Sequence, residues 1–555
     1  MQNNKYDQGD SQSTKALQKR IEELLLSLPS LLEFPKSLKS SNNYDGKAAD
    51  VQTPKYSVKN HNEALKNFVD CSTIVDAVQS YRSLVSIHKD SLTVVLRKEF
   101  PYIYNKPSQT NVKFPEKAIF IVGAGPCGLR AAIECAKLKI KTVVIEKRTE
   151  LTRTNVVYLK DFVIGDITTL GAGLFSSDLR EQCKNNVVQI SLLQLNLTKI
   201  ALLHGVDIYL GYEFCDVLYP PASAQGFTCQ YLKHDNATCS CKKDNLRNFA
   251  FDVIIGASGG NFILNDMFKR ISINRSNKNP SISITANFSR SDLTHEDKID
   301  YNFRKTHQLG FNDECLLHYS HFNKDYFIMT ANSHVLKEFG VLRKTVSAKD
   351  LMKHKDLILH PSNVNKEKLK KYIYLAISHA IRNDINYLTL LKTRTGDDDV
   401  SIFICSPQVA ANHAIRFVVR QNWKLMILLV GDSLIHPHWP TGFGLAKGLM
   451  GVFDSVYTIY QYFNSEQNLT KICALRESLY KHLLQLTSSA VKSYDVDFCF
   501  DPSTRYKSKI AVGDVKMYNK LIDVETILPM VRIKKPLSNF KRRHNTKKMQ
   551  KLLAR

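Results

Sequence analysis

The sequence lacks long apolar runs, an apolar leader and a surplus of acidic residues. Its longest apolar run, residues 425–430, is far shorter than the ~18 residues of a membrane-spanning helix. The first 30 residues contain no apolar stretch of the signal-peptide type. We therefore expect neither a membrane span nor secretion, and the protein should reside in the cytoplasm or the nucleus.

Acidic residues are outnumbered, with 52 Asp and Glu against 77 Lys and Arg, which gives a formal net charge of +25. Such a charge favours acidic protein surfaces, anionic lipid or nucleic acid as partners without choosing among them. The apolar fraction of 43% and the charged fraction of 23% are those of a globular protein. A chain of 555 residues is long enough for several cooperating domains.

Cysteine is also modest in number, at 12 residues. Together with the missing leader, this indicates reduced thiols. The group Cys229, Cys239 and Cys241 has a Cys-x-Cys spacing but no second pair of ligands. We interpret these residues as ordinary thiols and expect no metal site.

The first informative motif occupies residues 117–146. An apolar run at 118–122 predicts a buried strand, and the segment Gly123-Ala-Gly-Pro-Cys-Gly128 follows it. A helix-like run and a second strand come next, and the second strand ends at Glu146. A strand, a glycine turn, a helix and a strand closed by an acid are typical of a dinucleotide-binding site.

Each residue type in this motif suits one task. Gly123 allows a tight turn, Gly125 lets a pyrophosphate approach the backbone, and Gly128 lets the helix pack closely on the strand. The helix N-terminus offers N–H groups to the phosphates. Glu146 can accept hydrogen bonds from ribose hydroxyls, and Cys127 is small enough for the phosphate turn.

A second motif indicates FAD rather than NAD as the bound dinucleotide. An apolar strand at 423–430 leads into Asp432, which is placed to bind a ribityl hydroxyl. The turn that contains Pro440, Gly442 and Gly444 precedes a long apolar helix. The positive end of that helix would stabilise the negative charge of a reduced flavin.

These motifs resemble those of the flavoprotein monooxygenase domain of the MICAL family, within the aromatic-hydroxylase-like flavin enzymes. The resemblance covers roughly residues 62–525. It is carried by Gly123-Ala-Gly-Pro-Cys-Gly-Leu-Arg-Ala-Ala-Ile-Glu134, Glu146-Lys-Arg148, Arg153-Thr-Asn-Val156, Ile284-Thr-Ala-Asn-Phe288, Tyr326-Phe-Ile-Met-Thr-Ala331, Leu429-Val-Gly-Asp-Ser-Leu434, Trp439-Pro440 and Asp501-Pro-Ser-Thr-Arg-Tyr506.

The resemblance implies an α/β fold. We expect a Rossmann-like FAD-binding domain of the aromatic-hydroxylase type with an inserted mixed-sheet monooxygenase domain and helical flanks. The expected parts are a flexible segment at 1–60, a helical lead-in at 61–115, the FAD-binding domain at 116–285 and 396–470, the insert at 286–395, a helical extension at 471–525 and a basic tail at 526–555.

The resemblance also implies chemistry. MICAL enzymes use FAD and NADPH, and they oxidise methionine residues of actin to the sulfoxide, which disassembles filaments. By position, Asn155 lies near the flavin edge and Trp439 flanks the isoalloxazine, while Tyr319 falls in the region of an aromatic pair beside the flavin. We take these three as the candidate catalytic residues.

The same comparison assigns the cofactor contacts. Asp432 would hold the ribityl chain, and Glu146 with Arg148 would hold the adenosine side. The remaining expected cofactor-binding residues are Gly123, Gly125, Cys127, Gly128, Arg153, Asn155, Pro440, Gly442 and Gly444.

One segment departs from the family. The usual Gly-Ala-Asp-Gly-Arg-Arg run reads Gly256-Ala-Ser-Gly-Gly-Asn261 here. The Asp and both arginines are missing where nicotinamide-dinucleotide contacts are expected, and Ser and Asn cannot replace a charge-assisted phosphate contact. Two alternatives therefore stand beside the monooxygenase: an NADPH oxidase or aromatic hydroxylase on the same fold, and a catalytically weakened FAD-binding interaction protein.

The end of the sequence is basic. Residues 532–555 contain many Lys and Arg and neither Asp nor Glu. This pattern is typical of a nuclear-localisation signal, of an electrostatic arm for actin, nucleic acid or lipid, or of a solvated tail. Aromatic residues are too sparse there for base stacking. We do not expect the calponin-homology and LIM modules that are usual in the family. We do expect the protein to associate with the cytoskeleton.

Overall fold

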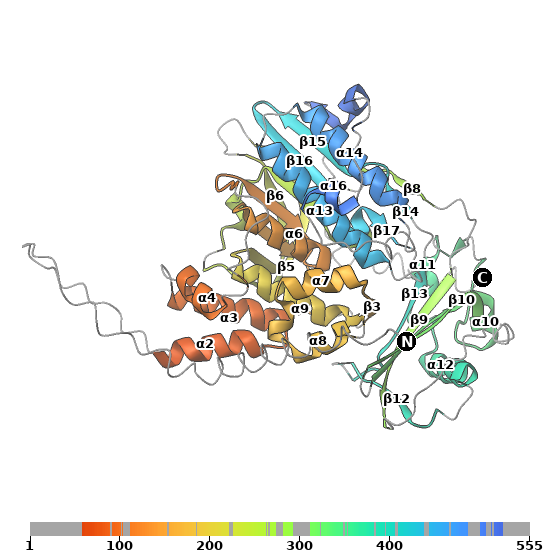
Figure 1. Cartoon of the computed structure of the whole chain (residues 1–555). Coiled ribbons are helices and arrows are strands. Elements are labelled where there is room, and N and C mark those ends of the chain that lie inside the picture. The colour runs from red at the N-terminus through yellow and green to blue at the C-terminus, as the bar shows by residue number, and fades with distance from the viewer. Residues whose placement is uncertain are drawn as a thin grey trace, which may run out of the picture.

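The computed structural model describes residues 58–524 apart from internal gaps, of which the longest are 104–111, 274–280, 292–310 and 487–499. Its largest element is an eight-stranded sheet with the order β18-β15-β16-β7-β1-β2-β5-β6 (Figure 1). The strands are β1 (Ala118–Val122), β2 (Lys141–Glu146), β5 (Asp207–Leu218), β6 (Thr228–Cys239), β7 (Val253–Gly256), β15 (Ile415–Arg420), β16 (Trp423–Leu429) and β18 (Ile522–Val524).

The centre of this sheet is parallel. Strands β16, β7, β1, β2 and β5 run in one direction, whereas β6 and β15 join it in antiparallel pairs. The central strands are buried on both faces, and their continuous apolar runs are what a covered parallel sheet requires. Sequence-distant β16 thus pairs with β7, so the two halves of the chain build one sheet.

Helices pack against this sheet and against one another. Helix α6 (Pro126–Lys137) packs between α9 (Ile190–Leu203) and α13 (Gly444–Asn464), and α14 (Leu469–Gln485) packs on α13 (Figure 1). The remaining elements of this part are α7 (Asp161–Thr169), α8 (Ser177–Lys184), α16 (Pro502–Tyr506), β3 (Val156–Tyr158), β4 (Val187–Gln189), β8 (Arg270–Ser272), β14 (Val409–Ala411) and β17 (Ile435–His436).

Among the described residues, three helices precede the sheet: α2 (Val58–Asp70), α3 (Ile74–Ile87) and α4 (Leu92–Glu99). Helix α3 packs on α9. The buried Lys199 of α9 donates hydrogen bonds from Nζ to the carbonyl oxygens of Val69 and Cys71, at 2.6 and 3.0 Å. The turn between α2 and α3 is therefore fixed to the main domain by a buried cation.

A second sheet, inserted in the chain, has its own core. It contains β9 (Ser281–Arg290), β10 (Phe311–His321), β11 (Lys324–Ala331), β12 (Leu388–Leu390) and β13 (Val400–Cys405), with α10 (Ser333–Glu338), α11 (Lys355–Ile358) and α12 (Lys366–Ile381). Within its described strands every pair is antiparallel. The mixed pairing lies in the main sheet instead. The predicted class, an α/β Rossmann-like fold with an inserted sheet and helical flanks, is confirmed.

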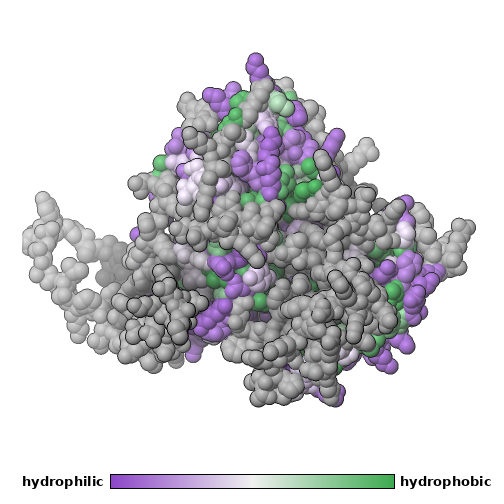
Figure 2. Space-filling model, turned by 45° about the vertical axis from the view of Figure 1, so that its right-hand side comes forward, coloured by the Kyte–Doolittle hydropathy of each residue, from purple (hydrophilic) through white to green (hydrophobic). Residues whose placement is uncertain are grey.

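The surface mixes polar and apolar side chains. Figure 2 shows hydrophilic residues interspersed with small hydrophobic areas on one face of the molecule. Among the described residues, no helix is long and apolar enough to span a membrane.

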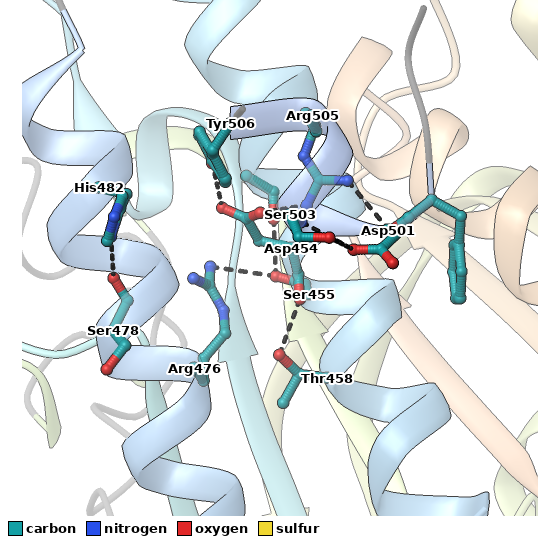
Figure 3. Close-up of polar contacts among 12 residues, drawn as sticks. Asp454, Ser455, Thr458, Arg476, Ser478, His482, Asp501, Ser503, Arg505 and Tyr506 are labelled. Atoms are coloured by element: carbon teal, nitrogen blue, oxygen red, sulfur yellow. Dashed lines mark hydrogen bonds and ion pairs between the residues drawn. The ribbon is translucent and has the colours of Figure 1, made fainter. Parts of the chain in front are cut away.

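A buried ionic cluster joins the C-terminal helices (Figure 3). The Asp454 carboxylate of α13 accepts hydrogen bonds from Arg505 and, at 2.7 Å, from the Tyr506 hydroxyl, both on α16. Arg476 of α14 donates to Ser455 at 3.2 Å. Asp454, Arg476 and Arg505 are each fully buried. Burial, reinforced by the Asp454 charge, raises the pKa of Tyr506 well above its ordinary value, so this hydroxyl remains a neutral donor.

We expect Asp454→Asn to lower the free energy of unfolding by about 3–5 kcal/mol, because removing one partner leaves a buried charge uncompensated. Tyr506→Phe removes one neutral donor and should cost about 1–2 kcal/mol. Urea unfolding followed by circular dichroism measures both. Lys184→Ala is the control, since it breaks only an exposed pair with Glu181. Equal midpoints for Asp454→Asn and Lys184→Ala would contradict this interpretation.

Candidate functional site

The first glycine turn connects β1 to α6. Gly123 has a φ of +112°, and a Cβ there would lie 2.7 Å from the Ala257 carbonyl oxygen. A Cβ at Gly128 would collide with the Gly123 carbonyl oxygen. At Gly125, in contrast, a Cβ would meet nothing within 4 Å. The turn is therefore closed by backbone contact on two sides and open at Gly125.

The open side coincides with the start of α6. Gly125 is the N-cap of this helix and provides no side-chain cap, and Pro126 follows it. Glu146, at the end of β2, lies beside the turn: its carboxylate accepts 3.0 Å hydrogen bonds from the backbone N–H groups of Ala124 and Arg148. Arg148 itself is exposed. The Glu146 carboxylate therefore lies beside the turn from which α6 begins.

The second motif packs directly on the first. The Cys127 sulfur lies between two glycines of the second motif: a Cβ at Gly431 would be 3.1 Å from it, and a Cβ at Gly448 would be 2.6 Å from it. Burial, with a contribution from the Asp432 carboxylate, raises the pKa of Cys127. The prediction that the two sequence-distant motifs meet is confirmed by these contacts.

Both motifs begin at the carboxyl ends of parallel strands of the same sheet, the first after β1 and the second after β16. The N–H of Val430, after β16, donates to the carbonyl of Gly256, the last residue of β7, at 3.0 Å. The Ser433 hydroxyl donates to the Gly259 carbonyl at 2.7 Å. Open α/β sheets bind ligands in the crevice at this edge.

The divergent segment belongs to the same edge. Ser258 and Gly260 are exposed, and a Cβ at Gly260 would lie 3.6 Å from the ring of His436. Asn261 ends the short helical turn η3 (Gly259–Asn261). The positions that carry Asp and Arg in the family pattern are thus located beside the two glycine motifs.

A hydrogen bond links the insert to the main domain beside β3. The Asn155 side-chain amide donates to the Tyr326 hydroxyl at 3.4 Å. Tyr326 belongs to β11 and is 3% exposed, and its burial raises its pKa to about 12. Tyr319 on β10 is the register partner of Tyr326. The sequence motifs predict no role for Tyr326, although it is the first residue of the Tyr326–Ala331 motif.

The other predicted residues are placed as follows. Gly444 begins α13, and a Cβ there would lie 2.6 Å from the Pro437 ring. Arg153, Trp439, Pro440 and Gly442 lie outside the described residues. Within the described part of the chain, no group of three or more His, Cys, Asp or Glu residues could hold a metal ion.

A separate cleft of about 1410 Å³ lies between the main domain and the insert. It is lined by residues of α3 and α9 on one side and of α12 and β13 on the other. None of the predicted cofactor residues that the structure describes lines it, so it is not the opening at Gly125.

Buried Arg130 fixes the orientation of α6. Its guanidinium donates to the Asp166 carboxylate twice, at 2.8 Å, and to Glu134 at 2.6 Å. It also stacks on the Phe453 ring of α13, 4.6 Å from the centroid. Burial acts to raise the pKa of Glu134, but Arg130 and Lys137 outweigh it and lower this pKa to about 2.

Comparisons with known proteins agree with the sequence motifs. The profile of the family described as "Mical, Rossman domain" matches residues 281–404, which form most of the inserted sheet. The chain is 33% identical to [F-actin]-monooxygenase mical1 of Danio rerio over 78% of the chain and 35% of that protein. Identity is 33% to Mical of Drosophila melanogaster, over 70% of the chain and 8% of that protein, and 32% to MICAL2 of Homo sapiens, over 80% and 23%.

Solved structures are more distant. A complex of aklavinone-11 hydroxylase with FAD and aklavinone has a TM-score of 0.42 at 13% identity, with 67% of each chain covered. An anhydrotetracycline hydroxylase from Streptomyces rimosus has a TM-score of 0.41 at 12% identity, with 66% and 68% covered.

The fold and the paired glycine motifs define a Rossmann-like protein of the dinucleotide-binding class. Within this class, the chain is a relative of the MICAL proteins, as its motifs predict. It spans about a third or less of the length of these three relatives.

We expect Gly128→Ala to lower the free energy of unfolding by about 3 kcal/mol or more, because the added methyl group overpacks a backbone contact. Gly125→Ala meets no atom and should cost less than about 1 kcal/mol, as a change of N-cap residue. Thermal and urea unfolding measure both. Equal stabilities for the two variants would show that the turn is not closed as described.

We expect Glu134→Gln to cost about 2–3 kcal/mol at pH 7. The pKa of Glu134 is lowered from 4.5 to about 2 in the folded state, so its ionised form stabilises the fold above pH 4.5 and this contribution is lost as the pH falls toward 2. Urea unfolding from pH 7 to pH 3 should therefore show the two proteins converging in acid. A difference independent of pH would contradict the assignment.

Proposed function

We propose that the protein is an FAD-dependent monooxygenase that uses NADPH and O2 to oxidise methionine residues of a protein substrate, actin, to the sulfoxide, and so promotes filament disassembly. The observation that carries this proposal is the position of Cys127 between Gly431 and Gly448, because it brings the phosphate turn and the Asp432 motif together. The names of the relatives, which are F-actin monooxygenases, supply the reaction class and the substrate.

The residues present suit FAD. The open side of Gly125 and the start of α6 would receive the pyrophosphate, since uncapped N–H groups and the helix dipole favour anions. Glu146 retains lone pairs for ribose hydroxyls beside its two backbone bonds. Asp432 would bind the ribityl chain, and Gly444 at the start of α13 would face the flavin pyrimidine edge.

Bound FAD supplies, once reduced, the activation of O2 for transfer to a soft nucleophile such as a thioether sulfur. The protein itself positions the reacting groups and excludes water from the site. The hydrogen bond from Asn155 to Tyr326 links the insert to the main domain, and we propose that this contact borders the flavin. With a pKa near 12, Tyr326 stays neutral at pH 7, so it orients groups by hydrogen bonding and does not act as a base.

The divergent segment favours a second candidate. Ser258, Gly260 and Asn261 offer no charge to a second dinucleotide where the family pattern has Asp and two Arg. This difference supports a catalytically weakened FAD-binding protein, or an enzyme that releases peroxide as an NADPH oxidase. We propose cytoplasmic residence at the actin cytoskeleton, since the net charge of +25 favours acidic protein surfaces.

An anaerobic stopped-flow experiment separates these cases. The purified chain should be yellow, and its flavin absorbance should bleach on addition of NADPH. Persistent colour would favour the weakened protein. In air, filamentous actin should then acquire methionine sulfoxide, mapped by mass spectrometry. Hydrogen peroxide release that actin does not suppress, with unmodified actin, would favour the oxidase.

We expect Gly125→Val to abolish flavin retention while the fold persists, because the valine side chain would fill the opening where we propose that the pyrophosphate binds. Gly165→Val is the matched control, since a Cβ at Gly165 also meets nothing within 4 Å and this residue is exposed on α7. Flavin content per folded protein, measured by absorbance after gel filtration, is the readout. A yellow Gly125→Val protein would overturn the placement of the phosphates.

A further inference from the structure

Two cysteines outside the candidate site lie in direct contact. Cys239 is the last residue of β6, and Cys241 follows in the bend after Ser240. Each thiol group affects the pKa of the other through a side-chain interaction, and the Cys239 sulfur lies 3.5 Å from the Cys241 carbonyl oxygen. The bend therefore keeps two sulfur atoms of one short segment together.

The surroundings favour a reactive pair. Cys239 is 5% exposed and Cys241 is half-buried, so solvent reaches the pair on the Cys241 side. The side-chain interaction with Cys241, together with the charge of Arg82 on α3, lowers the pKa of Cys239 against the effect of its burial. The thiolate is the nucleophilic form of cysteine. The Cys241 sulfur also lies 3.4 Å from the Tyr209 hydroxyl oxygen.

We propose that Cys239 and Cys241 form a dithiol that hydrogen peroxide closes to an intrachain disulfide. The Cys239 thiolate attacks one oxygen of the peroxide and breaks the O–O bond, which gives a sulfenic acid and hydroxide. The Cys241 sulfur then attacks the Cys239 sulfur, and its proton leaves with the expelled oxygen as water. In sum, two thiols and one peroxide give one disulfide and two waters.

A neighbouring pair shows why the site is selective. Cys215 on β5 and Cys229 on β6 also lie on paired strands, where Cys229 is the register partner of Val217. Burial raises the pKa of both. Neither thiol of that pair is held as a thiolate, so peroxide should react there more slowly.

Closure of the disulfide also bears on the lead-in helices. Arg82 of α3 donates to the carbonyl oxygen of Lys242 at 3.3 Å, directly after Cys241. A ring through residues 239–241 would turn this peptide and change the contact. Formation of the disulfide would therefore change a contact of α3, the helix that also lines the cleft facing the insert.

The test uses the full chain and needs no cofactor turnover. Reduced protein is exposed to a small excess of hydrogen peroxide at pH 7.5, capped with N-ethylmaleimide and digested with trypsin. Residues 234–242 form one tryptic peptide with both cysteines, and residues 200–233 form another that contains Cys215 and Cys229. We expect the first peptide to form a disulfide, which is two hydrogen masses lighter than the dithiol and carries no N-ethylmaleimide, at least about tenfold faster than the second peptide. Dithiothreitol should reverse this change.

Variants assign the roles. Cys241→Ser should leave Cys239 as a sulfenic acid that dimedone traps, and Cys239→Ser should remove the fast reaction. Cys229→Ser is the control and should leave it unchanged. The proposal is overturned if both cysteines of the 234–242 peptide stay capped, if the two peptides oxidise equally fast, or if Cys239 pairs with another cysteine. Because peroxide is added, these outcomes do not depend on flavin chemistry.

Discussion

Contact between backbones at the carboxyl edge of the sheet is the constraint on which the rest of the structure depends. Gly123 and Gly128 remove the side chains that would separate the first turn from the segment after β7 and from itself. Gly431 and Gly448 do the same around the Cys127 sulfur. Because the small Cys127 side chain packs directly against glycines of the distant segment, the first turn and the segment that contains Asp432 are held together at the same edge of the sheet. The helices behind them then need rigid support, and Arg130 provides it between α6, α7 and α13.

Local patterns were sufficient for the part of the site that is local. The turn at 123–128 and its acid at Glu146 could be predicted, because spacing within one strand–helix–strand unit fixes their positions. The contact between the segment around Asp432 and this turn could be predicted only from a known family pattern, because residue spacing does not show that β16 pairs with β7. Tyr326 was missed as a site residue because its contact with Asn155 crosses from one sheet to another, and a strand pattern does not show which partner a tyrosine will face.

The burial of several charged residues could not be predicted from the sequence either. Arg130, Asp454 and Arg476 lie within helices whose apolar periodicity predicts the packing face, yet charged residues are ordinarily assigned to solvent. Here each guanidinium is joined to a carboxylate or hydroxyl inside the core. Only the three-dimensional pairing makes such burial tolerable, so the sequence alone could not indicate it. The same holds for the antiparallel insert, whose strand order depends on long returns of the chain.

The hydrogen bonds from Lys199 to the carbonyl groups of Val69 and Cys71 limit how far the chain can be shortened from its N-terminal side. If the chain were trimmed to begin at the first strand of the Rossmann unit, an ammonium group would face the interior with its two acceptors gone. Burial already lowers the pKa of Lys199, so the shortened protein would have to release a proton, admit water or loosen α9. The smallest autonomous folding unit therefore starts before α2 ends, well ahead of the nucleotide-binding motif.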